Sequence, residues 1–212
     1  MDIKIKICGL KEQYAIESSV DNGVNMLGFV FYEESPRNLD LNLAKKLFSI
    51  VPDNIISVAL LVNPTNDYLK RITNDIGIST IQLHGQETPK RTEEIKDIYN
   101  FDIIKAFSIK NDKSIQNCDL YVKSVSKFLF DAEPPVNSRR PGGNGNVFDW
   151  EILKNYNSKV PWILSGGLTP DNIKNAIEMS GANFVDVSSG VENKTGIKDI
   201  DLINKFVKNA RQ

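Results

Sequence analysis

The sequence is poor in the residues that build metal centres and disulfide frameworks. It contains two cysteines, Cys8 and Cys118, and one histidine, His84, among 212 residues. This spacing offers no metal-ligand pattern, so we expect no metal site. Two cysteines far apart in sequence fit reduced thiols better than a disulfide, which is typical of a cytoplasmic protein.

Long hydrophobic runs and an excess of charge of one sign are also missing. The longest apolar run is Val58–Val62, whereas a membrane span needs roughly 20 residues. Lys and Arg number 26 against 27 Asp and Glu, so no nucleic-acid-binding surface is indicated. The amino end alternates Lys with Ile and lacks the apolar stretch of a signal peptide. These absences predict a cytoplasmic protein with neither a nucleic-acid nor a membrane partner.

Eight short β-rich runs alternate with segments of helical spacing. The runs are Ile3–Cys8, Met26–Phe31, Ile56–Val62, Thr80–His84, Asp102–Phe107, Lys127–Asp131, Trp162–Ser165 and Phe184–Ser188. Alternating βα units predict a parallel sheet, and eight of them in 212 residues predict a single-domain α/β protein, a (β/α)8 TIM barrel over residues 1–212. An open doubly wound sheet is the alternative, although the first strand ends in Cys8-Gly-Leu10 rather than in a phosphate-binding glycine fingerprint.

The helical segments carry start and stop signals. Capping residues begin three of them, at Thr65, Thr88 and in Thr169-Pro-Asp171, and Gly77 and Gly181 stand where two should end. A further helix is expected around Asp112–Asp119.

Glycine-rich segments follow the last three predicted strands. Ser165-Gly166-Gly167 ends the seventh strand, Ser188-Ser189-Gly190 ends the eighth, and Gly142-Gly143-Asn144-Gly145 lies in the loop after the sixth. Glycines let backbone amides approach a ligand closely. Tight turns without a ligand are the alternative, but barrel enzymes often hold a phosphate after strands seven and eight. The sequence therefore predicts a phosphate site.

Two potential proton-transfer groups also stand at strand ends. Cys8 closes the first predicted strand and Asp131 the sixth, so both should point into the mouth of the barrel. An inert buried thiol and a loop-capping carboxylate are the alternatives. Cys118 lies in a polar context and is expected to be incidental.

Four other residues at the rim could contact a ligand. His84 ends the fourth strand, where a substrate contact and a structural role are both open. Arg37 follows the second strand and suits planar recognition of a carboxylate or phosphate. Arg139 and Arg140, in the loop after the sixth strand, are expected to be solvated or to cover an anionic ligand.

Side-chain alternation predicts an ion pair inside the barrel. Ile3, Ile5 and Ile7 should face the helices, which turns Lys6 inward below Cys8. Asp186 is inward on the neighbouring eighth strand, and a lone buried charge is costly, so we expect Lys6 and Asp186 to pair. The ammonium should also favour the Cys8 thiolate.

The same alternation predicts the orientation of two more strand residues. Gln82 on the fourth strand and Lys105 on the fifth are both expected to point into the barrel.

Taken together, the motifs resemble the phosphoribosylanthranilate isomerase family of tryptophan biosynthesis. The matching segments, in the family's order, are Lys6-Ile-Cys-Gly-Leu10, Gly28-Phe-Val-Phe31, Ser35-Pro-Arg37, Gln82-Leu-His-Gly85, Phe130-Asp131, Gly142-Gly-Asn-Gly145, Phe148-Asp-Trp150, Ser165-Gly-Gly-Leu-Thr-Pro-Asp-Asn172, Val185-Asp-Val-Ser-Ser-Gly-Val-Glu192 and Gly196-Ile-Lys-Asp199. The chain departs from the family pattern at Val58-Ala-Leu-Leu-Val-Asn63, at Asn144 and at Ala132-Glu-Pro-Pro135. Both proton-transfer residues are retained.

The resemblance implies a role for each matched residue. Cys8 would be the general base, Asp131 the general acid, and Arg37 the group that holds the anthranilate carboxylate. The phosphate would rest on backbone amides, around Gly143, Gly145, Gly166, Gly167, Ser188, Ser189 and Gly190.

The implied reaction is the Amadori rearrangement of N-(5-phosphoribosyl)anthranilate, in which an iminium ion serves as the electron sink. Neither a metal nor an organic cofactor is then expected, and the partner is a small phosphosugar bound by a monomer or homodimer. The alternatives are another sugar-phosphate isomerase or synthase and a non-catalytic phosphosugar-binding barrel.

Overall fold

The centre of the molecule is a closed ring of eight parallel strands. The computed structural model describes residues 3–136, 138 and 140–212. The strands of the ring are β1 (Lys4–Cys8), β2 (Met26–Phe31), β3 (Ile56–Leu61), β4 (Thr80–Leu83), β5 (Asp102–Ile109), β6 (Lys127–Ala132), β7 (Trp162–Leu164) and β8 (Phe184–Val187). Each pairs with the next, and β8 pairs with β1, where Lys6 lies opposite Asp186. The predicted (β/α)8 barrel is confirmed, and the open doubly wound sheet is excluded.

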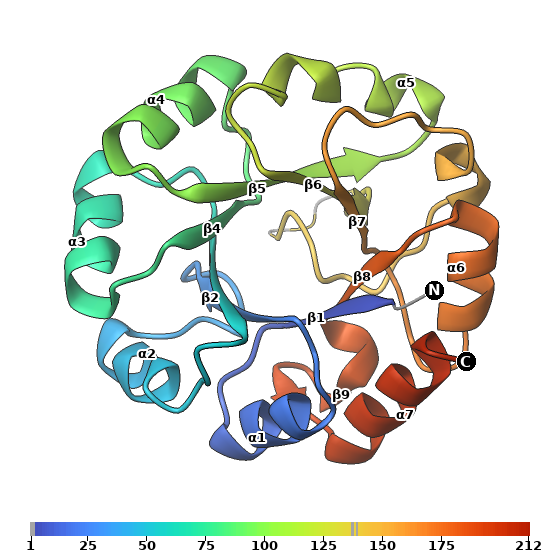
Figure 1. Cartoon of the computed structure of the whole chain (residues 1–212), viewed down its shortest axis with the longest axis horizontal. Coiled ribbons are helices and arrows are strands. Elements are labelled where there is room, and N and C mark those ends of the chain that lie inside the picture. Colours follow the sequence, from blue (N-terminus) through green and yellow to red (C-terminus); the bar gives the residue numbers. More distant parts are fainter. Residues whose placement is uncertain (1–2, 137, 139) are drawn as a thin grey trace.

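Helices surround the ring on its outside (Figure 1). They are α1 (Gln13–Asp21), α2 (Leu41–Phe48), α3 (Asn66–Ile76), α4 (Pro89–Tyr99), α5 (Asp112–Ile115), α6 (Ile173–Ser180) and α7 (Ile200–Ala210). The last helix, α7, packs against α1 and so completes the outer layer. In the described ranges, no helix combines the length and hydropathy needed to cross a bilayer.

Shorter elements lie between the strands and helices of the barrel. They are the 3-10 turns η1 (Cys118–Tyr121), η2 (Trp150–Leu153) and η3 (Ser189–Val191), and the hairpin of β9 (Glu192–Lys194) and β10 (Ile197–Lys198). The predicted helix over Asp112–Asp119 is wrong in detail, because the structure divides this stretch between α5 and η1.

Side-chain caps begin the helices mostly where the sequence predicts. The hydroxyl of Thr65 accepts from an amide in the first turn of α3, and that of Thr88 does the same in α4. The helix α6 begins later than the cap expected in Thr169-Pro-Asp171. Asn172 accepts from the Thr169 amide and donates to the Gly167 carbonyl, so a side-chain-stabilised turn precedes the helix, which begins only at Ile173.

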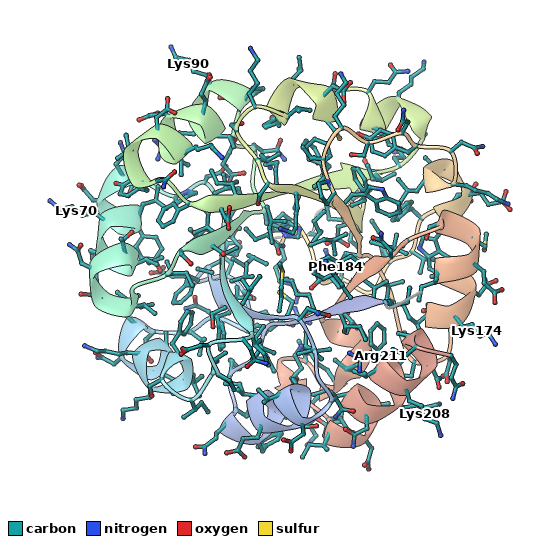
Figure 2. The ribbon with its side chains drawn as sticks, in the orientation of Figure 1. Lys70, Lys90, Lys174, Phe184, Lys208 and Arg211 are labelled. Atoms are coloured by element: carbon teal, nitrogen blue, oxygen red, sulfur yellow. The ribbon has the colours of Figure 1, made fainter. Side chains whose placement is uncertain are left out.

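Strand alternation divides the core into two parts. Outward-facing residues pack beneath the helices, while a smaller cluster fills the inside of the ring with Met26, Val58, Ile104, Ala106, Leu129, Ile163 and Phe184. Figure 2 shows Phe184 within the ring and Lys70, Lys90 and Lys174 projecting outward from the helices. The apolar filling includes the first residues of β2 and β8, so the carboxyl ends of the strands are left for polar groups.

Lys105 lies on the opposite face from the one predicted. It is the register partner of Leu83 in the helix-facing core, while its neighbours Ile104 and Ala106 face inward. Its ammonium is buried and lies 3.1 Å from Glu87 Oε2 in the loop after β4. The cause is that a strand buried on both sides has no polar face to reveal its orientation. Gln82, by contrast, does face inward and lines the mouth of the barrel.

Candidate active site

A cavity opens at the carboxyl ends of the barrel strands. It encloses about 780 Å³ of empty space, part of it open to solvent, and every predicted site residue except Gly190 lines it. Cys8 at the end of β1 and Asp131 in β6 therefore share one cavity. A Cβ at Gly190 would overlap the carbonyl oxygen of Leu168, so this glycine packs between the loops after β7 and β8. Its contact with a phosphate stays a prediction.

Beneath the cavity, the predicted ion pair is present. Lys6 Nζ donates to Asp186 Oδ1 at 2.8 Å, and Asp186 Oδ2 accepts from the Ser165 hydroxyl at 3.1 Å. Gly28 on β2 makes room for this arrangement, because a Cβ there would lie 2.7 Å from Cys8 Sγ and 3.1 Å from Lys6 Nζ. The sequence motif contained Gly28, but nothing in it revealed this packing role.

The Cys8 thiol is controlled by two opposing effects. Burial raises the pKa of Cys8, and the charges of Lys6 and Lys198 lower it without cancelling that rise. The predicted assistance from the ammonium is therefore real but is outweighed by desolvation. Burial would by itself lower the pKa of Lys6, yet Asp186 and Cys8 raise it overall. Lys6 is thus a stable cation that favours the thiolate form of Cys8, against the effect of burial.

Asp131 sits in a hydrogen-bonded row with His84 and Gln82. Asp131 Oδ1 accepts from the amide of Ala132 at 2.8 Å, and Oδ2 lies 3.3 Å from His84 Nε2. On the other side of the His84 imidazole, Gln82 Nε2 lies 2.9 Å from His84 Nδ1. Gly142 covers this row so closely that a Cβ would come within 2.6 Å of Asp131 Oδ2. His84 therefore contacts the predicted acid as well as the cavity.

Arg37 is held at the cavity wall by its own loop and by a buried carboxylate. A bridge between Asn38 and Val30 returns the loop to β2. The guanidinium makes a bidentate ion pair with Glu192, with Nε donating to Oε1 at 2.6 Å and Nη2 to Oε2 at 2.9 Å. Lys198 Nζ donates to Glu192 Oε1 at 2.8 Å. Arg37 is only 4 % exposed, which rules out a solvated surface arginine.

Gly166 and Gly167 form the wall that follows β7. Their φ angles are +88° and +63°, a conformation that side chains rarely adopt. A Cβ at Gly166 would lie 2.6 Å from the Ala132 amide, and one at Gly167 would lie 2.5 Å from the Asn146 carbonyl. Only glycine lets the loops after β6 and β7 meet here. Ser188 and Ser189 continue the wall after β8.

The loop after β6 contributes a cavity residue whose surroundings the sequence did not define. Arg140 lines the cavity, and its Nη1 is buried without a hydrogen-bond partner among the described residues. It is therefore a cavity residue rather than a solvated charge. Arg139 lies outside the described residues.

Comparisons with known proteins agree with one another. The family model described as N-(5'phosphoribosyl)anthranilate (PRA) isomerase matches residues 5–209. The N-(5'-phosphoribosyl)anthranilate isomerase of Rhodospirillum rubrum is 41% identical over 212 residues, covering 98% of this chain and 97% of that protein.

Among the described residues, no group of three acidic, histidine or cysteine side chains is arranged to hold a metal ion.

Solved structures show the same likeness. Phosphoribosyl anthranilate isomerase from Thermotoga maritima superposes with a TM-score of 0.87 at 31% identity, covering 98% of both chains. A phosphoribosyl anthranilate isomerase in complex with reduced 1-(o-carboxyphenylamino)-1-deoxyribulose 5-phosphate superposes with a TM-score of 0.85 at 30% identity, again covering 98% of both chains. Sequence, fold and site together place this chain in the N-(5'-phosphoribosyl)anthranilate isomerase family.

Proposed function

We propose that this protein converts N-(5-phosphoribosyl)anthranilate into 1-(2-carboxyphenylamino)-1-deoxyribulose 5-phosphate, with Asp131 as general acid and Cys8 as general base. The observation that carries the proposal is that these two groups, which come from separate strands, line one cavity together with Arg37 and the glycine-rich wall. An acid and a base in different protonation states are what an Amadori rearrangement needs.

In the first step, Asp131 gives its proton to the oxygen of the furanose ring. The bond between this oxygen and C1′ breaks, and the nitrogen lone pair forms the C1′–N double bond of an iminium ion. Asp131 Oδ1 is occupied by the Ala132 amide, which leaves Oδ2, beside His84, to carry the transferred proton.

In the second step, the Cys8 thiolate removes the proton from C2′, whose acidity the adjacent iminium increases. The electron pair moves to the nitrogen and gives an enolamine, which takes up a proton at C1′ and loses the proton of its C2′ hydroxyl to form the ketone. Burial raises the pKa of Cys8, so a thiolate formed there is a stronger base than an ordinary one. Because the iminium accepts the electrons, the proposed route uses no cofactor.

The two anionic ends of the substrate would orient it between these groups. Arg37 suits the carboxylate of the anthranilate ring, and the backbone around Gly166, Gly167, Ser188 and Ser189 suits the phosphate. Binding energy from the remote phosphate would hold C2′ against the thiolate. We further propose that the enzyme acts in the cytoplasm as a monomer or homodimer.

A fluorescence assay with freshly generated phosphoribosylanthranilate tests the activity directly. We expect catalytic amounts of protein to remove the fluorescent substrate and to yield one isomeric product, identified by chromatography against the authentic ketose. A protein that leaves phosphoribosylanthranilate unchanged, while it isomerises or merely binds another sugar phosphate, would contradict the proposal.

A further inference from the structure

Arg37 offers only part of its guanidinium to the cavity. Glu192 occupies Nε and one N–H of Nη2. Of the five N–H donors of a guanidinium, this leaves those of Nη1 and one on Nη2. Nη1 is turned toward the loop after β6, which lines the cavity, because a Cβ on Gly143 in that loop would lie 2.8 Å from it. Glu192 thus fixes the plane of the guanidinium and selects the edge that can meet a ligand.

The same contact has an electrostatic cost for binding an anion. Arg37 and Glu192, paired bidentately, carry no net charge, so on their own they would attract an incoming carboxylate weakly. Burial acts to raise the pKa of Glu192, but Arg37 and Lys198 lower it overall, so this carboxylate is ionised. A further positive charge is needed if this part of the cavity is to favour an anion.

Lys198 is placed to supply that charge. Its side chain is fully buried, and Nζ donates to Glu192 Oε1 at 2.8 Å, to the Ser188 carbonyl at 2.9 Å and to the Ser188 hydroxyl at 3.3 Å. Burial lowers the pKa of Lys198 and Glu192 opposes that shift, and the three acceptors match the three donors of an ammonium group. The hairpin of β9 and β10 creates this contact, because its turn residue Gly196 also donates to Glu192, at 3.0 Å.

We propose that Lys198 provides the net positive charge with which Arg37 binds the substrate carboxylate, and that Glu192 orients the guanidinium for it. This inference rests on the role proposed above for Arg37. Both Lys198 and Glu192 act through Arg37 and are positioning residues, since the lining of the cavity includes neither. Lys198 also contacts Ser188, so a role at the phosphate end is the competing explanation that an experiment must separate.

Isothermal titration calorimetry with two ligands makes this separation. One ligand is reduced 1-(o-carboxyphenylamino)-1-deoxyribulose 5-phosphate, and the other is the same compound without the ring carboxylate. For Lys198→Met we expect the first ligand to bind at least about tenfold more weakly, while the second changes by less than about threefold. Lys205→Met is the matched control, because it removes the same charge from an exposed ion pair with Asp171 and should change neither affinity.

A second variant covers the possibility that Lys198→Met fails to fold with Glu192 buried next to it. In Glu192→Gln/Lys198→Met both charges are removed, so Arg37 keeps its own charge and a hydrogen-bond acceptor. We expect the affinity ratio of the two ligands to return to within about threefold of the wild-type ratio.

Three results would overturn the inference. In the first, Lys198→Met weakens the binding of both ligands equally. In the second, it weakens the binding of neither. In the third, the affinity ratio of the two ligands is further from the wild-type ratio in the double variant than in Lys198→Met. If the wild-type protein binds the two ligands equally, the role proposed for Arg37 is itself wrong.

Discussion

Lys6 and Asp186 are register partners on the neighbouring strands β1 and β8, and their side chains meet at 2.8 Å inside the barrel, beside Cys8. The pair closes the ring at the point where the first and last strands join. Lys6 is fully buried and Asp186 nearly so, so removing either residue leaves the other charge without its counter-ion inside the barrel. The same ammonium acts on Cys8, so this contact links the stability of the barrel to the state of the proposed base.

Removing the charge of Lys6 should therefore destabilise the protein strongly. We expect Lys6→Met to lower the free energy of unfolding by about 3–5 kcal/mol, because it leaves the Asp186 carboxylate buried without a counter-ion. Chemical denaturation measures this change. Lys6→Met/Asp186→Asn, which removes both charges, should recover part of the loss. A single variant within about 1 kcal/mol of the wild type would contradict a buried, mutually dependent pair.

The ionisation of Cys8 provides a second prediction. In Cys118→Ala, which leaves Cys8 as the only thiol, the ultraviolet absorbance of the thiolate should emerge only above the ordinary range of cysteine. The reason is that burial raises the pKa of Cys8. Lys6→Met in the same background should raise the pKa further, because Lys6 favours the thiolate. A midpoint below about 8.5 would show that the lysine outweighs burial.

The backbone of Gly166 should be necessary for placing the acid. Its φ is +88°, and a Cβ there would lie 3.2 Å from Asp131 Oδ1 and 2.6 Å from the Ala132 amide. We expect Gly166→Ala to displace Asp131 and to lower kcat by about tenfold or more. Gly77→Ala is the matched control. Gly77 has a φ of +72° in open space at the end of α3, so it should cost stability while kcat stays unchanged. Equal kcat values in the two variants would show that Gly166 is not needed to place Asp131.

Cys118 should be inert in the folded protein. It is completely buried, and burial raises its pKa to about 12, so almost no thiolate is present for reaction. With a thiol-specific disulfide reagent at neutral pH, we expect Cys118 to be modified only as the protein unfolds. Peptide mapping after brief labelling checks this, and modification of Cys118 in the native state would contradict it.

How much the sequence could predict differs between the strands and their connections. Lys6 and Asp186 were paired correctly because each strand shows a clear alternation. Lys105 was assigned to the wrong face because β5 is apolar on both sides.

The contacts of Arg37 with Glu192 and of Glu192 with Lys198 were missed for another reason. Glu192 and Lys198 stand on β9 and β10, strands of three and two residues, which are too short to show a period. Glu192 is also 155 positions along the chain from Arg37. Only the need of a buried guanidinium for a counter-ion could have indicated such a partner.

The central claim is that Cys8 and Asp131 carry out the two proton transfers, and single-turnover conversion of phosphoribosylanthranilate by Cys8→Ser and Asp131→Asn tests it most directly. Both variants should bind the reduced product analogue with nearly wild-type affinity, because each change keeps the size of the side chain and leaves the ion pair of Arg37 with Glu192 in place. Each should lower the rate of conversion by at least about 10²-fold, the usual reach of acid–base catalysis. A near-normal rate in either variant would contradict the role proposed for that residue.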